Sequence, residues 1–227
     1  MKLSVKRGPK NSADILIYDA IGPEDWGLVS AKAISKELDA LGAVDQINVG
    51  INSPGGYVFE GLAIYNLLHG HPAAVTVDIH GAALSIASII AMAGDKIRIA
   101  ESAMMMIHDP WGMVAGNAAE LRKEADVLDQ LKGSLIGIYA ARTGMDNQQL
   151  ADMMTAETWL QADQALASKF VDEIAPNKQA VNAVDLSKFK NVPQWATKAA
   201  APPTETKEIP WRRNLAERRL EMLRQGF

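Results

Sequence analysis

The stretch Gly81-Ala82-Ala83-Leu84-Ser85-Ile86-Ala87-Ser88 decides the fold predicted for this chain. Before it, residues 75–79 alternate between apolar and polar, which is typical of a β-strand. Residues 82–93 are almost all small or aliphatic, which predicts a helix that is buried on every side. A strand that leads straight into a buried helix indicates a sheet covered by helices.

Ser85 opens the predicted helix and is the candidate nucleophile. The N-terminus of a helix has free N–H groups and partial positive charge, which favour an ionised oxygen and stabilise a developing oxyanion. A serine at this position is more often only a cap, so the assignment needs partners elsewhere in the chain. Ser88 lies one helical turn later on the same side and is the second choice.

The composition is that of an ordinary soluble protein. The 227 residues carry a formal net charge of -4 and contain no cysteine. This charge argues against a protein that coats nucleic acid, and the missing thiols exclude disulfides and cysteine-ligated metals. No apolar run is long enough for a signal peptide or a membrane span, so we expect a cytoplasmic protein.

Strand and helix patterns alternate through the first half of the chain, which indicates an α/β fold with a parallel sheet. We expect strands at 13–21, 46–51, 75–79, 96–100 and 103–107, and helices at 31–41 and 57–68. Three consecutive methionines, Met104 to Met106, suit core filling better than a binding site.

A turn with two glycines follows the second of these strands, at Asn52-Ser53-Pro54-Gly55-Gly56. Adjacent glycines allow a tight turn and leave backbone N–H groups uncovered, as an oxyanion site requires. The same pair is also common in ordinary turns between a strand and a helix.

His108 is the best placed of the four histidines to act as a base. It ends the last apolar strand, where catalytic side chains of open α/β sheets are commonly found. His69 and His71 lie in a polar loop, and the alternation of its strand turns His80 away from the buried face.

A long helix is predicted from Asn117 to Arg142, with an apolar stripe that includes Leu121, Leu128 and Leu135. At 1.5 Å per residue it would measure roughly 35 to 40 Å, more than one sheet edge needs. We expect it to project and pair with a neighbour, although it could also lie back on its own domain. Residues 176–227 are expected to form a linker and a short basic amphipathic helix, Pro210 to Gln225.

Four motifs together resemble the Clp protease proteolytic-subunit family of serine peptidases, and most of all its phage and prophage head-maturation branch. They are residues 51–56, 81–85, 106–110 and 157–172, in the family's order and spacing. The resemblance covers about residues 15–174 and implies a peptidase domain at 1–175. It implies the Clp protease and crotonase-like core of repeated β-β-α units, with a protruding handle helix.

The resemblance implies a role for each motif residue. Ser85 corresponds to the nucleophile, His108 to the general base, and the backbone N–H groups of Gly56 and Ile86 to the oxyanion donors. Glu157 corresponds to the acid, where most members have aspartate, and Asp152 is the reserve.

The family also implies partners and a place of action. We expect subunit rings, stacked through the helix at 117–142, with no metal, cofactor, nucleic acid or membrane. The substrates would be capsid or scaffold proteins, cleaved in a bacterial or phage-infected cell or inside the assembling head.

Three other interpretations stay open. An acyl-CoA enzyme of the crotonase type would use a similar pair of glycines without needing Ser85 and His108. A serine-lysine peptidase would need Lys96, Lys123 or Lys132 in an apolar pocket. An inert ring-forming subunit would tolerate a glutamate in place of the usual aspartate.

Overall fold

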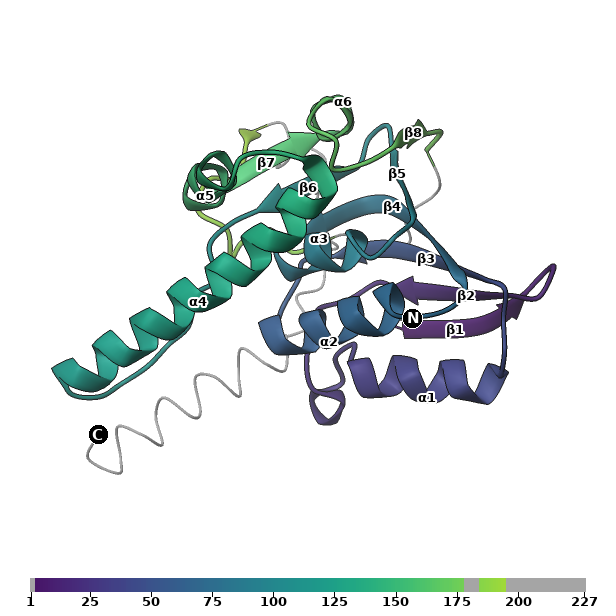
Figure 1. Ribbon diagram of the computed structural model, residues 1–227, viewed down its shortest axis with the longest axis horizontal. Helices are drawn as coiled ribbons and strands as arrows, with labels where there is room; N and C mark the ends of the chain where they lie inside the picture. Colours follow the sequence, from purple (N-terminus) through teal and green to yellow (C-terminus); the bar gives the residue numbers. More distant parts are fainter. Residues whose placement is uncertain (1–2, 178–183, 195–227) are drawn as a thin grey trace.

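A mixed β-sheet forms the centre of the protein, for which a computed structural model describes residues 3–177 and 184–194 (Figure 1). Six of the strands follow the order β1-β2-β3-β4-β5-β8, while β6 pairs with β4 and β7 pairs with β6. The strands are β1 (Leu3–Gly8), β2 (Ser12–Ile17), β3 (Gln46–Ser53), β4 (Ala74–Leu84), β5 (Lys96–Ala100), β6 (Met104–Ile107), β7 (Thr158–Gln161) and β8 (Glu173–Ala175). The helices are the 3-10 helix η1 (Glu24–Trp26), α1 (Ala31–Leu41), α2 (Val58–His69), α3 (Ile86–Ala91), α4 (Ala118–Thr143), α5 (Asn147–Thr155) and α6 (Ala162–Ala167).

The central strands β2, β3, β4, β5 and β8 are parallel, as the alternation of strand and helix patterns predicted. Their inward side chains form one aliphatic core, which includes the fully buried Ile15, Ile47 and Ile97. The opposite face is more polar, because the half-buried Thr76, Asp78 and His80 alternate with the buried apolar residues of β4. The predicted α/β fold class is confirmed.

The change from strand to helix comes later than the sequence predicted. Ala82 to Leu84 belong to β4 and pair with Met104 to Met106 of β6, and helix α3 begins only at Ile86. The predicted helical start at Ala82 is therefore wrong. A short apolar run suits a buried strand as well as a buried helix, and here β6 supplies a hydrogen-bonding partner. The predicted burial holds, because all six residues of α3 are buried.

Two antiparallel pairings were not predicted. β1 pairs with β2, and β7 pairs with β6. β1 is only partly buried and includes Lys6 and Arg7, so it lacks the apolar run that marks the central strands. As a result the sheet is mixed rather than wholly parallel.

The long helix α4 confirms the helix predicted from Asn117 to Arg142. Asn117 forms a capping box with Glu120 at its start, and Gly144 ends it in the left-handed conformation. The buried residues of α4, Leu135, Ile136, Tyr139 and Thr143, all lie in its C-terminal half. The N-terminal half extends beyond the sheet (Figure 1).

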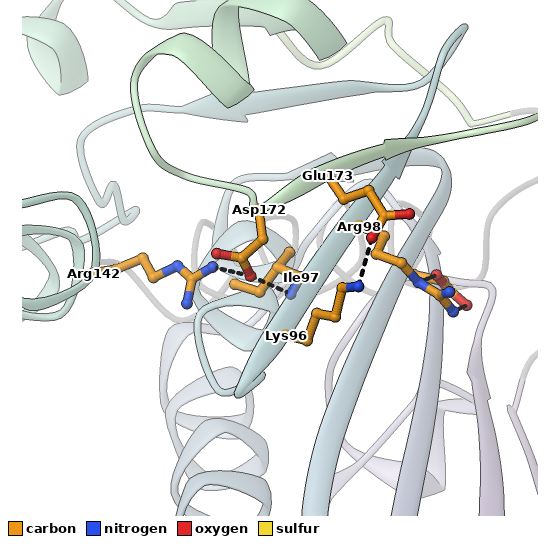
Figure 2. Close-up of polar contacts among 7 residues, drawn as sticks. Lys96, Ile97, Arg98, Arg142, Asp172 and Glu173 are labelled. Atoms are coloured by element: carbon orange, nitrogen blue, oxygen red, sulfur yellow. Dashed lines mark hydrogen bonds and ion pairs between the residues drawn. The ribbon is translucent and has the colours of Figure 1, made fainter.

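Asp172 joins the end of α4 to the sheet (Figure 2). Its carboxylate accepts hydrogen bonds from the Ile97 backbone N–H, at 2.7 Å, and from the Arg142 guanidinium. Burial raises the pKa of Asp172, but these two hydrogen bonds and the charge of Arg142 outweigh it and lower that pKa. Beside it, Lys96 of β5 forms an ion pair with Glu173 of β8.

Residues 184–194 lie against the β6 and β7 end of the sheet, within the interval expected to be a linker. The boundary near residue 175 stays a prediction, and the basic helix expected at 210–225 lies outside the described residues. Among the helices described at 3–177, none combines the length and the apolar character that a membrane crossing needs.

Candidate active site

Ser85 lies at the junction between β4 and α3, in an unusual backbone conformation. Its φ is 56° and its ψ is -129°, a region that residues with a side chain rarely occupy. Such a residue costs about 1 to 3 kcal/mol and persists only where its surroundings fix it. Here the Ser85 N–H donates to the Met106 carbonyl at 2.9 Å, and its own carbonyl accepts from the Ser88 N–H at 2.9 Å.

His108 is brought to Ser85 by the pairing of two strands. Leu84 is paired with Met106, so the residues that follow β4 and β6 leave the sheet side by side. The Nε2 atom of His108 is 2.8 Å from the Ser85 Oγ atom. This distance is within the range in which a base takes a hydroxyl proton.

The pKa of His108 is lowered, chiefly because burial disfavours its charged form. The charge of Glu157 raises that pKa, the charge of Lys188 lowers it, and the charge of Asp109 raises it. A lowered pKa favours the neutral imidazole, which is the form that can accept a proton.

The Gly55-Gly56 turn packs against the Ser85 junction. Gly55 has a φ of 79°, and a Cβ atom on it would lie 2.5 Å from the Leu84 carbonyl oxygen and 2.7 Å from the Ser85 Cβ. Ile21 fixes the turn, because its N–H donates to the Gly55 carbonyl and its carbonyl accepts from the Tyr57 N–H. Thus Gly56 and Ile86, the two predicted oxyanion donors, belong to segments in direct contact.

Glu157 occupies the corner between α5 and β7, with a φ of 51°. Its carboxylate accepts from the Trp159 indole N–H at 3.3 Å and from the backbone N–H groups of Lys190 at 3.3 Å and Asn191 at 2.7 Å. Among the described residues it forms no hydrogen bond with His108. Its charge nevertheless acts on that imidazole.

Residues 12–178 match the Clp protease family. The chain belongs to this family. Proteolytic subunit 3 of the ATP-dependent Clp protease of Rhodococcus jostii is 34% identical over 163 residues, which cover 66% of this chain and 80% of that protein. The proteolytic subunit from Deinococcus radiodurans is 32% identical over 139 residues, which cover 60% of this chain and 68% of that protein.

The fold agrees with this membership. A ClpP1 mutant from Listeria monocytogenes has a similar structure, with a TM-score of 0.64 and 27% sequence identity over 73% of this chain and 92% of that chain. The chain is a serine peptidase of the Clp type.

The reserve candidates of the sequence do not join this Clp protease site. Ser88 is fully buried, and its hydroxyl is bonded to the Ser85 carbonyl and, at 2.7 Å, to the Tyr139 hydroxyl. Asp152 accepts instead from the Gln148 side chain at 2.9 Å. Lys132 forms an ion pair with Asp109, with 2.8 Å between its Nζ atom and Oδ1. Its ammonium group is therefore held by a carboxylate, which gives no support to a serine-lysine peptidase.

A small depression beside Ser85 and His108 is mostly apolar. Its other lining residues are Val58, Ile86, Ile89, Pro110, Leu135 and Tyr139. Ser85, His108 and Tyr139 are its lining residues with polar side chains.

Sequence reasoning missed Phe189, whose ring packs against His108 with a centroid distance of 5.9 Å. The change in composition after Pro176 predicted a linker there. A signal was present, because Val184, Leu186, Phe189 and Val192 are apolar residues spaced through a polar segment. Nothing local in that spacing indicates which surface the segment covers.

Proposed function

We propose that this chain is the endopeptidase that cleaves capsid or scaffold proteins during phage head maturation, with Ser85 as nucleophile and His108 as general base. The observation that carries the chemistry is the 2.8 Å separation between Ser85 Oγ and His108 Nε2. The substrate class is supported by the four motifs at 51–56, 81–85, 106–110 and 157–172, which together resemble most of all the head-maturation branch.

The proposed reaction follows the usual order for a serine peptidase. Ser85 Oγ attacks the scissile carbonyl carbon while His108 Nε2 takes its proton. The N–H groups of Gly56 and Ile86 stabilise the oxyanion of the tetrahedral intermediate. When the C–N bond breaks, His108 returns the proton to the leaving amine. Water, activated by His108, then hydrolyses the acyl-enzyme and releases Ser85.

Glu157 is the proposed acid of this mechanism. Its charge opposes the effect of burial on the His108 pKa, and so stabilises the imidazolium that forms during attack. It also lies outside the hydrogen-bonding reach of the imidazole in the described contacts. Its contribution is therefore electrostatic, and smaller than that of an acid bonded directly to the ring.

The proposed assembly is a homo-oligomeric ring, in which α4 contacts a second subunit. Exposed apolar side chains gather on and before the projecting half of α4, namely Trp111, Met113, Val114, Leu121 and Val127. Patches of this kind mark protein contacts. Light scattering after size exclusion should show smaller particles for Leu121→Glu than for the wild type. Leu166→Glu, at an exposed residue of α6, is the matched control and should leave the size unchanged.

Co-expression with phage head proteins tests the proposed substrate. Mass spectrometry should find new termini in a capsid or scaffold protein with the wild type and none with Ser85→Ala. Cleavage that persists in Ser85→Ala would refute the nucleophile. Cleavage of general unfolded substrates with every head protein left intact would refute the substrate class. Intact substrates of both kinds would favour an inert ring-forming subunit.

A further inference from the structure

Residues 184–194, here called the C-terminal strap, cover one side of the candidate active site. Phe189 is their central residue and is only 9% exposed. Its ring meets His108 nearly edge to face, at 5.9 Å and 73°, and meets Trp159 at 5.4 Å and 87°. Edge-to-face packing of this kind holds a ring in a defined orientation.

The strap packs on strands that carry the catalytic pair. Its apolar residues join a second core, separate from the main one, whose other buried members are Ala82, Leu84, Met104, Met106 and Trp159. Leu84 directly precedes Ser85, and Met106 lies two residues before His108. Loss of the strap would therefore expose the outer face of the β4, β6 and β7 strands beside the site.

The strap also holds the carboxylate of Glu157. The Asn191 N–H donates to its Oε1 atom at 2.7 Å, and the Lys190 N–H donates to its Oε2 atom at 3.3 Å. The Asn191 side chain donates further to the Ala156 carbonyl at 3.2 Å, which fixes the same corner. An ionised carboxylate has about four acceptor positions, so the described bonds leave one of them free on Oε2.

The strap lies outside the part of the chain that matches the family, which ends at residue 178. The residues of the strap that contact His108 and Glu157 thus lie beyond the region that matches the family.

We propose that the C-terminal strap is a working part of the active site, in which Phe189 positions the His108 imidazole and the strap amides hold Glu157 beside it. This inference rests on the proposed function of Ser85 and His108. Phe189 is a positioning residue, because it acts on the reaction only through the imidazole. The strap therefore promotes the reaction of Ser85 and His108 and does not inhibit it.

Loss of the strap should be detectable as a change in the pKa of His108, which three nearby charged groups also influence. They are Glu157 at the corner before β7, Asp109 in the loop after β6 and Lys188 on the strap itself. Burial is the main cause of the lowered His108 pKa. Removal of the Phe189 ring admits water, so that pKa should rise toward its ordinary value. The low-pH limb of any reaction that needs neutral His108 should then move to higher pH.

The test is the rate at which a fluorophosphonate labels Ser85, measured against pH in the full chain. Phe189→Ala should slow labelling about tenfold, since each factor of ten is about 1.4 kcal/mol of barrier, and should move the low-pH limb upward. Phe189→Leu keeps most of the apolar volume and should recover about a third of the wild-type rate, with a smaller shift in the same direction. Leu38→Ala, which truncates a buried side chain of α1 outside the strap and its cluster, is the matched control and should keep the wild-type pH profile.

A double variant tests whether Phe189 and Glu157 act on labelling together. In a Glu157→Gln background, Phe189→Ala should slow labelling by a smaller factor than in the wild type, because one target of the strap is already lost. Full additivity of the two effects would contradict a joint action on Glu157 and His108.

The outcomes separate this inference from the proposed function. An unlabelled wild type would refute the function itself. A labelled wild type with an unchanged rate and pH profile in Phe189→Ala, or with faster labelling, would overturn the strap's role. If circular dichroism shows that Phe189→Ala is unfolded, Phe189→Leu decides, and a wild-type profile in that variant overturns the proposal.

Discussion

Ser85 and Glu157 both have positive φ values, 56° and 51°, but the molecule holds them in different ways. The main sheet fixes Ser85, through a hydrogen bond to the Met106 carbonyl and through close packing of Gly55. The C-terminal strap holds the Glu157 carboxylate, through the N–H groups of Lys190 and Asn191, while the backbone N–H of Glu157 donates to the Met154 carbonyl. The position of Ser85 is thus set by the core, whereas the side chain of Glu157 depends on a segment at the surface.

The site therefore has two parts, one held by the core and one held by the strap, and the second should be easier to disrupt. A position fixed by buried strands is lost only when the core is disturbed, whereas a surface segment can detach at a smaller cost in free energy. His108 belongs to both parts, because its imidazole contacts both Ser85 and Phe189. Substitutions in each part should therefore have different sizes and different pH signatures.

The largest effect is expected at His108, where the two parts meet. His108→Ala removes the only base within reach of Ser85 in the described residues. The rate of Ser85 labelling and of peptide cleavage should fall by at least about 10³-fold, as for members of other catalytic triads. Circular dichroism should show a folded protein. Cleavage within tenfold of the wild type would contradict the role of His108.

Gly55→Ala tests the part held by the core. The new Cβ atom would approach the Leu84 carbonyl oxygen to 2.5 Å, at a φ of 79° that disfavours any side chain. We expect a loss of about 1 to 3 kcal/mol in unfolding free energy, and about 100-fold slower labelling because Ser85 is displaced.

The matched control is Gly133→Ala in α4, where a Cβ atom meets nothing within 4 Å. It should raise stability by about 0.5 to 1 kcal/mol and leave labelling unchanged. Equal labelling in Gly55→Ala and Gly133→Ala would show that the packed turn does not position the nucleophile.

Glu157→Gln tests the part held by the strap. Loss of its charge removes a cause that raises the His108 pKa, so that pKa should fall further. Labelling should slow about tenfold at neutral pH, less than for a directly bonded acid, with its low-pH limb moved to lower pH. Phe189→Ala should move the same limb to higher pH. If the low-pH limb moved in the same direction in both variants, the charge of Glu157 and burial by Phe189 would not be two opposing causes of the His108 pKa.

The smallest effect on catalysis is expected at Asp172, which belongs to neither part. The hydrogen bonds that lower its pKa stabilise the folded protein above its ordinary value of 3.8, and this contribution is lost as pH falls through the lowered value. Asp172→Asn should lower the unfolding free energy by about 1 kcal/mol at pH 7, since solvent screens much of the pairing with Arg142.

Urea titrations at pH 7 and below pH 3 measure this difference between Asp172→Asn and the wild type. The difference should shrink in acid, and labelling at pH 7 should stay within twofold of the wild type. A stability gap that stays constant across this pH range would contradict the contribution of the carboxylate.

The features of the site that were best predicted from the sequence are those carried by short motifs. The closeness of Ser85 and His108 could be predicted because each follows an apolar strand, and parallel pairing of β4 and β6 then brings them together. The boundary at Ala82 was misplaced because an apolar run does not distinguish a buried strand from a buried helix. The contact of Phe189 with His108 could not be predicted, since it spans 81 residues of chain (189 minus 108) and depends on tertiary packing alone.

The central claim is that the Ser85 hydroxyl is activated by His108, and peptide mapping after fluorophosphonate treatment tests it most directly. The wild type at pH 7 should carry one adduct, on the peptide that contains Ser85, and His108→Ala should carry none under the same conditions. An adduct on another serine, or equal modification of Ser85 in both proteins, would contradict the account.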